Sequence, residues 1–201
     1  MDTSRLIREL CLRGVELWSD SGRLCYRSRK GALPEEKLAD LRRLKPQLLD
    51  VLCGRRAVSV PLSPGQEALL FHQQTWPHSR NYNLPTALLV EGIEDQAVIG
   101  SALRALAKRH LILGSRIEFA NGEPLLSLDP DRVPDVVWED ASGFSPERLQ
   151  QRLAAESDRP FSLSAEAPVR FLVLHLGSGT YCLMMCLHHI ITDGMSMTIL
   201  I

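Results

Sequence analysis

Hydrophobic positions in the first part of the chain predict a helix, a β-hairpin and two further helices. Leucine and isoleucine recur at helical spacing up to Gly14, and short alternating runs lie on both sides of the turn at residues 19–22. Later leucines also recur at helical spacing, and Pro46 is expected to divide that run because it lacks an N–H. The expected elements are a helix over residues 3–13, strands over residues 15–18 and 23–29, and helices over residues 34–45 and 46–53.

The remainder of the chain mixes helical and strand periods, which predicts an α/β fold. Ser63 and Pro64 are typical of the N-cap and the first residue of a helix. Asn121-Gly122 between two apolar runs is a strong hairpin signal. The other expected elements are a strand ending at residue 91, helices over residues 95–108 and 145–156, and buried strands over residues 169–176 and 181–187.

The residues after the last of these strands carry the strongest chemical signal. His188 and His189 stand where the strand ends, and Asp193 and Gly194 then break it, with Asp193 placed to cap a helix. Neighbouring side chains of a strand point to opposite faces, so the two histidines are not expected to share one metal or one substrate. Such a histidine is either a hydrogen-bonded core residue or a catalyst, and the spacing alone leaves both open. No metal site is expected, because no third ligand is near in sequence.

Composition narrows the classes of function. A formal net charge of −1 over 201 residues gives no reason to expect nucleic acid as a partner. No apolar run is long enough to cross a membrane. Residues 1–55 carry twelve Lys and Arg against eight Asp and Glu, whereas the rest carry eleven against sixteen, which predicts two units with different partners. The cysteines form neither a disulfide framework nor a zinc spacing, which favours a reduced cytoplasmic setting; they are Cys11, Cys25, Cys53, Cys182 and Cys186.

The pattern His188-His189-x-x-x-Asp193-Gly194 resembles the HHxxxDG signature of nonribosomal peptide synthetase condensation domains. These domains belong to the chloramphenicol-acetyltransferase-like acyltransferases. The resemblance implies an α/β sandwich, of which this chain would supply part of the N-terminal lobe within a longer synthetase. It also implies a catalytic signature in which His189 is the active-site residue, pointing into a tunnel where two carrier-bound substrates meet, and Asp193 is mainly structural.

Two further stretches resemble motifs of the same family. The matching residues are Ser63 and Gln66 in the first stretch and Arg109, His110 and Leu113 in the second. In the second motif the family carries an arginine that is expected to pair with the signature aspartate, but Gly114 replaces it here. Arg116 lies two positions further along what we expect to be a strand, and therefore on the same face. Arg116 is thus the candidate partner that would support Asp193.

The order of elements in residues 1–55 resembles the N-terminal docking domains of the tubulysin-synthetase type. The resemblance is carried by Gly14-Val15-Glu16-Leu17-Trp18, by Leu24-x-Tyr26, by Lys30-Gly31-x-Leu33 and by the leucine-rich helices. It implies that the C-terminal tail of an upstream synthase adds a strand to the hairpin edge. The residues expected to bind that tail are Arg23, Cys25, Arg27, Arg29 and Lys30. Because most of them are positively charged, we expect the tail to be acidic. The alternative is that these charges only solvate an edge strand and discourage aggregation.

We therefore expect a docking domain over residues 1–55, a linker over residues 56–61 and the truncated N-terminal part of a condensation domain over residues 62–201. The complete enzyme would form an amide from a donor acyl or peptidyl thioester and an acceptor aminoacyl thioester. His189 would take the amine proton as a general base, since an unperturbed imidazole titrates near the working pH, or would only orient the amine. The alternative function is a docking module with a catalytically inactive partial lobe.

Two related activities fit the signature less well. Epimerisation domains share it but follow a carrier domain, whereas a docking unit precedes it here. Cyclisation domains carry acidic residues in place of the histidines. The condensation reading implies no bound cofactor, because both substrates travel on the phosphopantetheine arms of donor and acceptor carrier proteins. It leaves open whether the docking domain is a homodimer.

Overall fold

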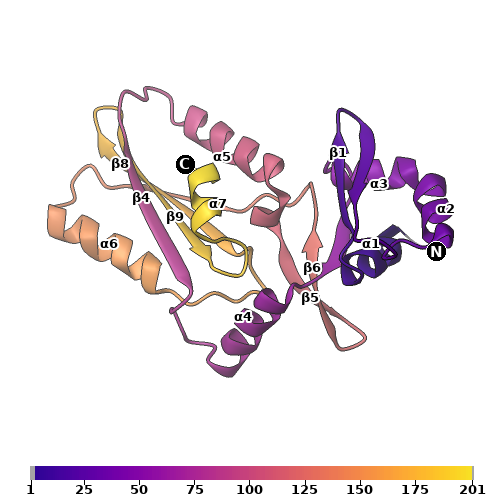
Figure 1. Cartoon of the computed structure of the whole chain (residues 1–201). Coiled ribbons are helices and arrows are strands. Elements are labelled where there is room, and N and C mark those ends of the chain that lie inside the picture. Colours follow the sequence, from indigo (N-terminus) through magenta and orange to yellow (C-terminus); the bar gives the residue numbers. More distant parts are fainter. Residues whose placement is uncertain (1–2, 201) are drawn as a thin grey trace. The chain divides into compact units, whose positions relative to one another are not determined.

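The computed structural model describes residues 3–200, which form two compact units. The first unit comprises the residues up to 62 together with residues 117–130, and the second comprises residues 63–116 and 131–201. Among the described residues, the first unit holds a two-stranded and a three-stranded sheet and the second holds a four-stranded sheet (Figure 1).

The first unit begins with the helix, hairpin and two helices that the sequence predicts. The hairpin turns at Ser21 and Gly22, whose φ angles of 49° and 78° are the left-handed values that a tight hairpin turn requires. Pro46 lies in the first turn of the last helix, where its missing N–H costs nothing. The elements are α1 (Thr3–Leu12), β1 (Glu16–Asp20), β2 (Arg23–Arg27), α2 (Glu35–Arg43) and α3 (Lys45–Leu52).

Residues 58–61, the second half of the expected linker over residues 56–61, form a strand of the first unit. This strand, β3 (Val58–Pro61), pairs antiparallel with β6 (Glu123–Leu128), and β5 (Arg116–Ala120) completes the sheet. Val58 is 6 % exposed and belongs to one core cluster with Leu6, Leu10 and Leu48. Four residues are too few to show a strand period, so the sequence did not reveal β3.

The second unit contains the remaining elements, most of which start or end within two residues of the predicted ones. They are α4 (Pro64–Thr75), β4 (Asn83–Val90), α5 (Ala97–Arg109), the 3₁₀ helix η1 (Leu111–Gly114), β7 (Val136–Asp140), α6 (Pro146–Asp158), β8 (Val169–Gly177), β9 (Thr180–His188) and α7 (Gly194–Leu200). The mixed α/β fold expected from the sequence is confirmed.

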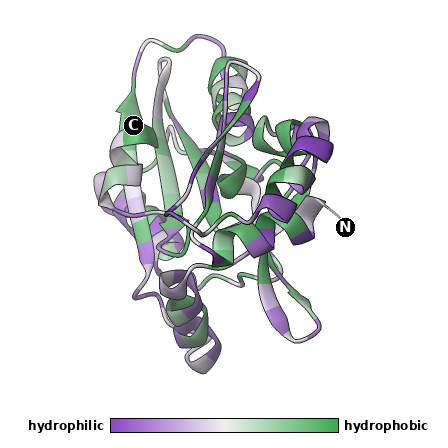
Figure 2. Cartoon of the chain, turned by 45° about the vertical axis from the view of Figure 1, so that its right-hand side comes forward, coloured by the Kyte–Doolittle hydropathy of each residue, from purple (hydrophilic) through white to green (hydrophobic). Residues whose placement is uncertain are grey.

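A four-stranded sheet in the order β4-β9-β8-β7 forms the centre of the second unit. β9 lies antiparallel to β4 and β8, and β7 lies parallel to β8 (Figure 1). The two central strands are hydrophobic along most of their length (Figure 2). Most of their residues are also buried. The register places His188 opposite Asn83, so the histidine pair stands at the end of a rigid central strand.

Candidate functional site

His188 is a buried residue at the end of β9. Its side chain is fully buried, and Nδ1 accepts a hydrogen bond from the Ile190 N–H at 3.1 Å. The proton therefore resides on Nε2, which lies 3.4 Å from Oε1 of the buried Gln73. Burial, together with the charges of nearby His189, His72 and Arg170, lowers the pKa of His188 to about 4. His188 is consequently neutral at physiological pH and fixed in one tautomer.

His189 has the opposite environment. Its side chain is exposed, while its main-chain N–H donates to the Tyr82 carbonyl at 2.8 Å. The ring lines a pocket of about 380 Å³ with polar groups from α4 and from the turn before α7. The polar residues around the pocket are Ser63, Gln66, His189, Thr192, Asp193 and Ser196. The expectation that the two histidines face opposite ways is confirmed.

One face of α4 joins this pocket to the core below it. Ser63 caps the helix as predicted, and its hydroxyl accepts the Gln66 N–H at 3.3 Å. The Gln66 side chain accepts the Ser63 N–H at 2.9 Å, which completes a capping box, and donates to the Ile190 carbonyl at 3.0 Å. Two turns further on, Gln73 donates to the carbonyls of Pro77 and Phe161 while it accepts from His188. Both glutamines thus connect α4 to the histidine pair.

Asp193 is the N-cap of α7. Its Oδ1 accepts the Ser196 N–H at 2.8 Å and the Ser196 hydroxyl at 2.7 Å. These hydrogen bonds, the hydroxyl first, lower the pKa of Asp193 below its usual value. Gly194 opens the helix, and a side chain at that position would meet no neighbouring atom. The helix start predicted after the histidines is therefore present.

The expected support of Asp193 by Arg116 is absent from the described residues. Arg116 makes no ion pair there, and its buried Nε has no hydrogen-bond partner. The expectation assumed that residues 114 and 116 share a strand face, but Gly114 ends a 3₁₀ helix and β5 begins only at Arg116. Gly114 is also tightly enclosed, since a Cβ there would overlap the Arg132 carbonyl. The arginine that the family motif carries would require the backbone here or at residue 132 to shift.

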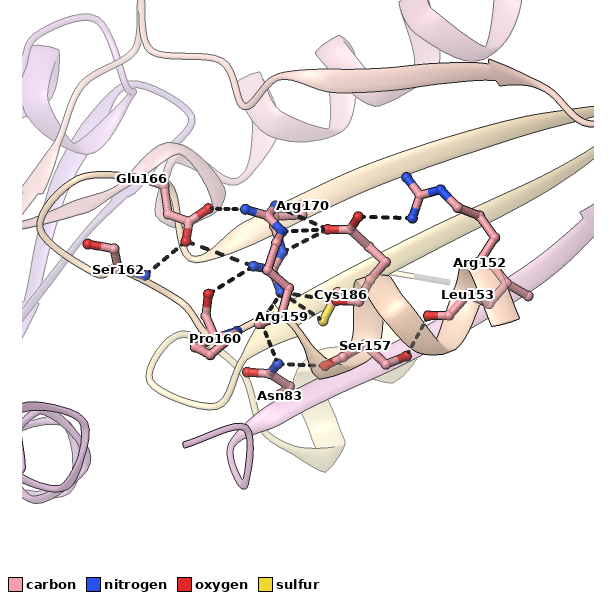
Figure 3. A network of polar contacts seen from close by, with 11 residues as sticks. Asn83, Arg152, Leu153, Ser157, Arg159, Pro160, Ser162, Glu166, Arg170 and Cys186 are labelled. Carbon is pink, nitrogen blue, oxygen red and sulfur yellow. Dashed lines mark hydrogen bonds and ion pairs between the residues drawn. The ribbon is translucent and has the colours of Figure 1, made fainter. Parts of the chain in front are cut away.

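A buried network that the sequence did not reveal supports the end of β9 from the side of α6 (Figure 3). Arg170, only 7 % exposed, donates to the carbonyls of Glu156, Arg159 and Pro160. Its Nε lies 3.2 Å from the Glu156 carboxylate, which also pairs with Arg159 and Arg152. Against the effect of burial, the hydrogen bond and charge of Arg159 and the charge of Arg170 lower the pKa of Glu156.

Phe161 links this network to His188. The Arg170 guanidinium lies 3.9 Å from the centre of the Phe161 ring, and that ring meets His188 edge-on with centres 5.7 Å apart. Asn83, opposite His188 in the sheet, donates to the carbonyls of Ser157 and Arg159 from the other side (Figure 3). The chain between α6 and β8 is thereby held around the buried histidine.

The hairpin face of the first unit that carries Arg23, Cys25 and Arg27 has mixed charge. Cross-strand partners place Arg27 opposite Glu16, Cys25 opposite Trp18 and Arg23 opposite Asp20. The Arg27 guanidinium is 3.5 Å from Glu16 and 5.8 Å from the centre of the Trp18 ring. β2 ends at Arg27, so Arg29 and Lys30 follow the strand instead of continuing it. Leu24 and Leu17 pack against the core, as alternation predicts.

A concave region of about 630 Å³ lies where this hairpin meets the end of α1. Its lining includes Arg13, Arg27 and Arg29 together with Glu16. Arg13 is a basic residue of this surface that the strand pattern does not identify, because it belongs to the helix end. Within residues 3–200, no strand pairs with the outer edge of β2.

The described residues contain neither a cluster of metal ligands nor a helix suited to cross a membrane. Among the described residues, no three or more His, Cys, Asp or Glu side chains gather as a metal site. No helix in the same part of the chain combines the length and apolar character needed to cross a membrane.

The second unit has the kind of α/β sheet found in chloramphenicol-acetyltransferase-like acyltransferases. Residues 57–201, well over half of the chain, match the family described as "Condensation domain", and the chain belongs to that family. Residues 4–53 match the "TubC N-terminal docking domain". Both resemblances expected from the sequence are confirmed.

The curated relatives are large peptide synthetases. The chain is 32 % identical over 142 residues to "Tyrocidine synthase 3" of Brevibacillus parabrevis, which covers 70 % of the chain and 2 % of that relative. It is also 29 % identical over 140 residues to "Gramicidin S synthase 2" of Brevibacillus brevis, covering 70 % and 3 %. The chain therefore spans only a small part of the length of these relatives.

Solved structures give the same placement. A structure described as "Molecular basis for condensation domain-mediated chain release from the enacyloxin polyketide synthase" matches all of this chain and 42 % of its own, with 25 % identity and a TM-score of 0.58. The "First condensation domain of the calcium-dependent antibiotic synthetase in complex with substrate analogue 2a" matches 71 % of this chain and 35 % of its own, with 25 % identity and a TM-score of 0.62.

Proposed function

We propose that the second unit supplies the N-terminal part of a condensation site in a nonribosomal peptide synthetase. The site would join a donor acyl or peptidyl thioester to the amine of an acceptor aminoacyl thioester, each carried on the phosphopantetheine arm of a carrier protein. The observation that carries the proposal is the exposed His189 ring in the polar pocket beside α4 and α7, above a neighbour that is buried and neutral.

In this reaction the amine nitrogen attacks the thioester carbonyl, a tetrahedral intermediate forms, and the C–S bond then breaks. His189 accepts the proton of the attacking amine and returns it to the departing thiolate. Imidazole suits this role because it exchanges protons readily near neutral pH. His188 and Asp193 do not act on the substrate in this proposal, since one is sealed in the core and the other caps α7.

The test is single-turnover amide formation between loaded donor and acceptor carriers, with a synthetase that contains this chain. His189→Ala should lower the rate at least about 10²-fold, the usual contribution of a general base or acid. His78→Ala is the control, because His78 is exposed and lines a different pocket. An unchanged rate in a folded His189→Ala enzyme would show that another residue does the chemistry. A His189→Gln enzyme that keeps the rate and its pH profile would favour orientation over proton transfer.

The first unit binds the C-terminal tail of an upstream synthase by strand addition along β2. What supports this second part of the proposal is the free outer edge of β2, which offers unpaired main-chain groups to an extended peptide. Arg29 and Arg13 beside that edge favour an acidic tail, whereas Arg27 already shares its charge with Glu16. Exposed ion pairs contribute about 0.2–1 kcal/mol each, so main-chain bonds would supply most of the affinity.

Titration of the whole chain with a peptide copied from the tail of the upstream synthase tests this part. Amide shifts should follow residues 23–30, and Arg13→Glu with Arg29→Glu should weaken binding several-fold, more at low salt than at high salt. Arg42→Glu with Arg56→Glu, at two exposed positions outside the hairpin, gives the matched charge change. Shifts confined to α2 and α3 would rule out strand addition. A chain that self-associates and binds no tail would instead mark the first unit as an oligomerisation element.

A further inference from the structure

Gln66 uses the two ends of its side-chain amide for two different tasks. Its Oε1 accepts the Ser63 N–H at 2.9 Å, which closes the capping box of α4. Its Nε2 donates to the Ile190 carbonyl at 3.0 Å, across 124 residues of sequence. The first bond is local to the helix, whereas the second reaches the turn that follows the histidine pair.

The carbonyl that Gln66 reaches belongs to Ile190, the residue that follows His189. The Ile190 N–H donates to Nδ1 of His188, and the Ile190 carbonyl accepts from Gln66. The His189 N–H donates to the Tyr82 carbonyl, and the Ile190 side chain is 3 % exposed. Hydrogen bonds therefore hold the backbone on both sides of His189, whose side chain lines the pocket.

From this geometry we propose that Gln66 is a positioning residue for His189, and that its donor end is the part that matters. This inference rests on the proposed function of His189. Removal of the Gln66–Ile190 bond leaves the Ile190 carbonyl without that donor and frees the turn between His189 and Asp193. The near-attack geometry of a base depends on placement to within about an ångström, so the rate falls although His189 remains.

Gln66→Glu separates this role from helix capping. A carboxylate still accepts the Ser63 N–H and suits the positive end of α4, because Glu and Gln both serve at this position of a capping box. It cannot donate to Ile190, however, and it faces that carbonyl with a negative charge. Ser63→Ala is the reverse control: it removes the hydroxyl that accepts the Gln66 N–H and leaves the link to Ile190 in place.

The first measurement is amide hydrogen exchange on the chain itself. Gln66→Glu should raise exchange at residues 190–193 roughly five- to tenfold, the factor that matches one lost hydrogen bond, with little change in melting temperature. Ser63→Ala should lower the melting temperature without that local increase. If Gln66→Glu does not fold, Gln66→Met replaces it, and the exchange it adds beyond Ser63→Ala is the quantity compared.

The second measurement is amide formation in a synthetase that contains this chain. Gln66→Glu should lower kcat about tenfold and leave KM for the loaded acceptor carrier within about twofold, because the lost bond affects the reacting geometry. Unchanged exchange together with unchanged kcat would overturn the proposal. If His189→Ala is fully active, the proposed function fails instead, and the exchange result still decides whether Gln66 holds the turn.

Discussion

His188 and His189 are adjacent in the chain, yet one is fully buried and the other lines an open pocket. His188 is the last residue of β9 and points into the core, whereas His189 begins the turn that follows and its side chain is exposed. The two side chains consequently have different tasks. The His188 ring forms hydrogen bonds to the Ile190 N–H and to the Gln73 side chain inside the core. The His189 side chain lines the pocket.

The neutral, buried state of His188 predicts acid sensitivity. Its pKa in the folded protein is about 4, below the value of 6.5 for a free histidine. The unfolded chain therefore binds a proton that the folded chain does not, and stability is lost as the pH falls from 6.5 toward 4. The full loss is about 3 kcal/mol. Urea unfolding of the chain at pH 7 and at pH 4.5 measures it.

His188→Asn is the matched variant for this prediction. The amide can replace part of the hydrogen bonding but does not titrate, so the variant should be less stable at pH 7 and lose less stability on acidification. Protonation of carboxylates such as Glu156, whose pKa is also lowered, will still destabilise both proteins in acid. Equal acid sensitivity of the two proteins would assign the whole effect to those carboxylates.

Replacing Gly114 by the arginine of the family motif should destabilise the folded protein. A Cβ at this position would overlap the Arg132 carbonyl, so the backbone of η1 or of residue 132 must shift. Gly114→Ala should cost about 1–3 kcal/mol of unfolding free energy, as overpacking does elsewhere, and Gly114→Arg at least as much. Gly143→Ala is the control because a side chain there meets no atom. Equal melting temperatures for both alanine variants would refute the steric explanation.

Substitution of Arg170, which does not line the pocket, should strongly lower the free energy of unfolding. Arg170→Met removes the buried cation beside the Glu156 carboxylate and the guanidinium that donates to three main-chain carbonyls, which should cost about 3–5 kcal/mol. Arg159→Met removes another partner of Glu156, but that side chain is 49 % exposed and the loss should stay near 1 kcal/mol. Calorimetry of both variants measures the difference. Similar losses would mean that Arg170 acts as one more surface ion pair.

The sequence predicts the regular parts of this molecule well because their patterns are long. The mainly apolar strands β8 and β9 and the helices α2 and α3, with their leucine spacing, each extend over eight or more residues. Tight turns are also visible, as Asn121-Gly122 takes the left-handed φ angles of 53° and 81° that its composition predicts. The motif residues Ser63, His189 and Asp193 then lie together around one pocket.

The parts that the sequence did not predict depend on contacts between distant residues. Gln66 and Gln73 resemble exposed helix residues until the fold brings Ile190 and His188 to them. The pairing of Arg116 with Asp193 requires a strand that includes residue 114, whereas residues 111–114 form a 3₁₀ helix. Four residues are too few to predict that helix from the sequence. Arg170 interrupts an apolar run, which is a signal of a buried charge, but its carbonyl partners come from another element.

The packing of Val58 bears on where the docking unit ends. If residues 56–61 were only a linker, the side chain of Val58 would be dispensable. Val58 is instead 6 % exposed and packs in the core that contains Leu6 and Leu10 of α1. Val58→Ala removes two buried methyl groups and should cost roughly 1.5–3 kcal/mol, with faster amide exchange in α1 and α3. Val137→Ala on β7, where the valine is 48 % exposed, should stay within about 0.5 kcal/mol and leave that exchange unchanged. Unfolding and exchange of the whole chain give both values. Protected α1 and α3 amides in Val58→Ala would return residues 58–61 to the role of a tether, and a docking unit cut at residue 55 would then be complete.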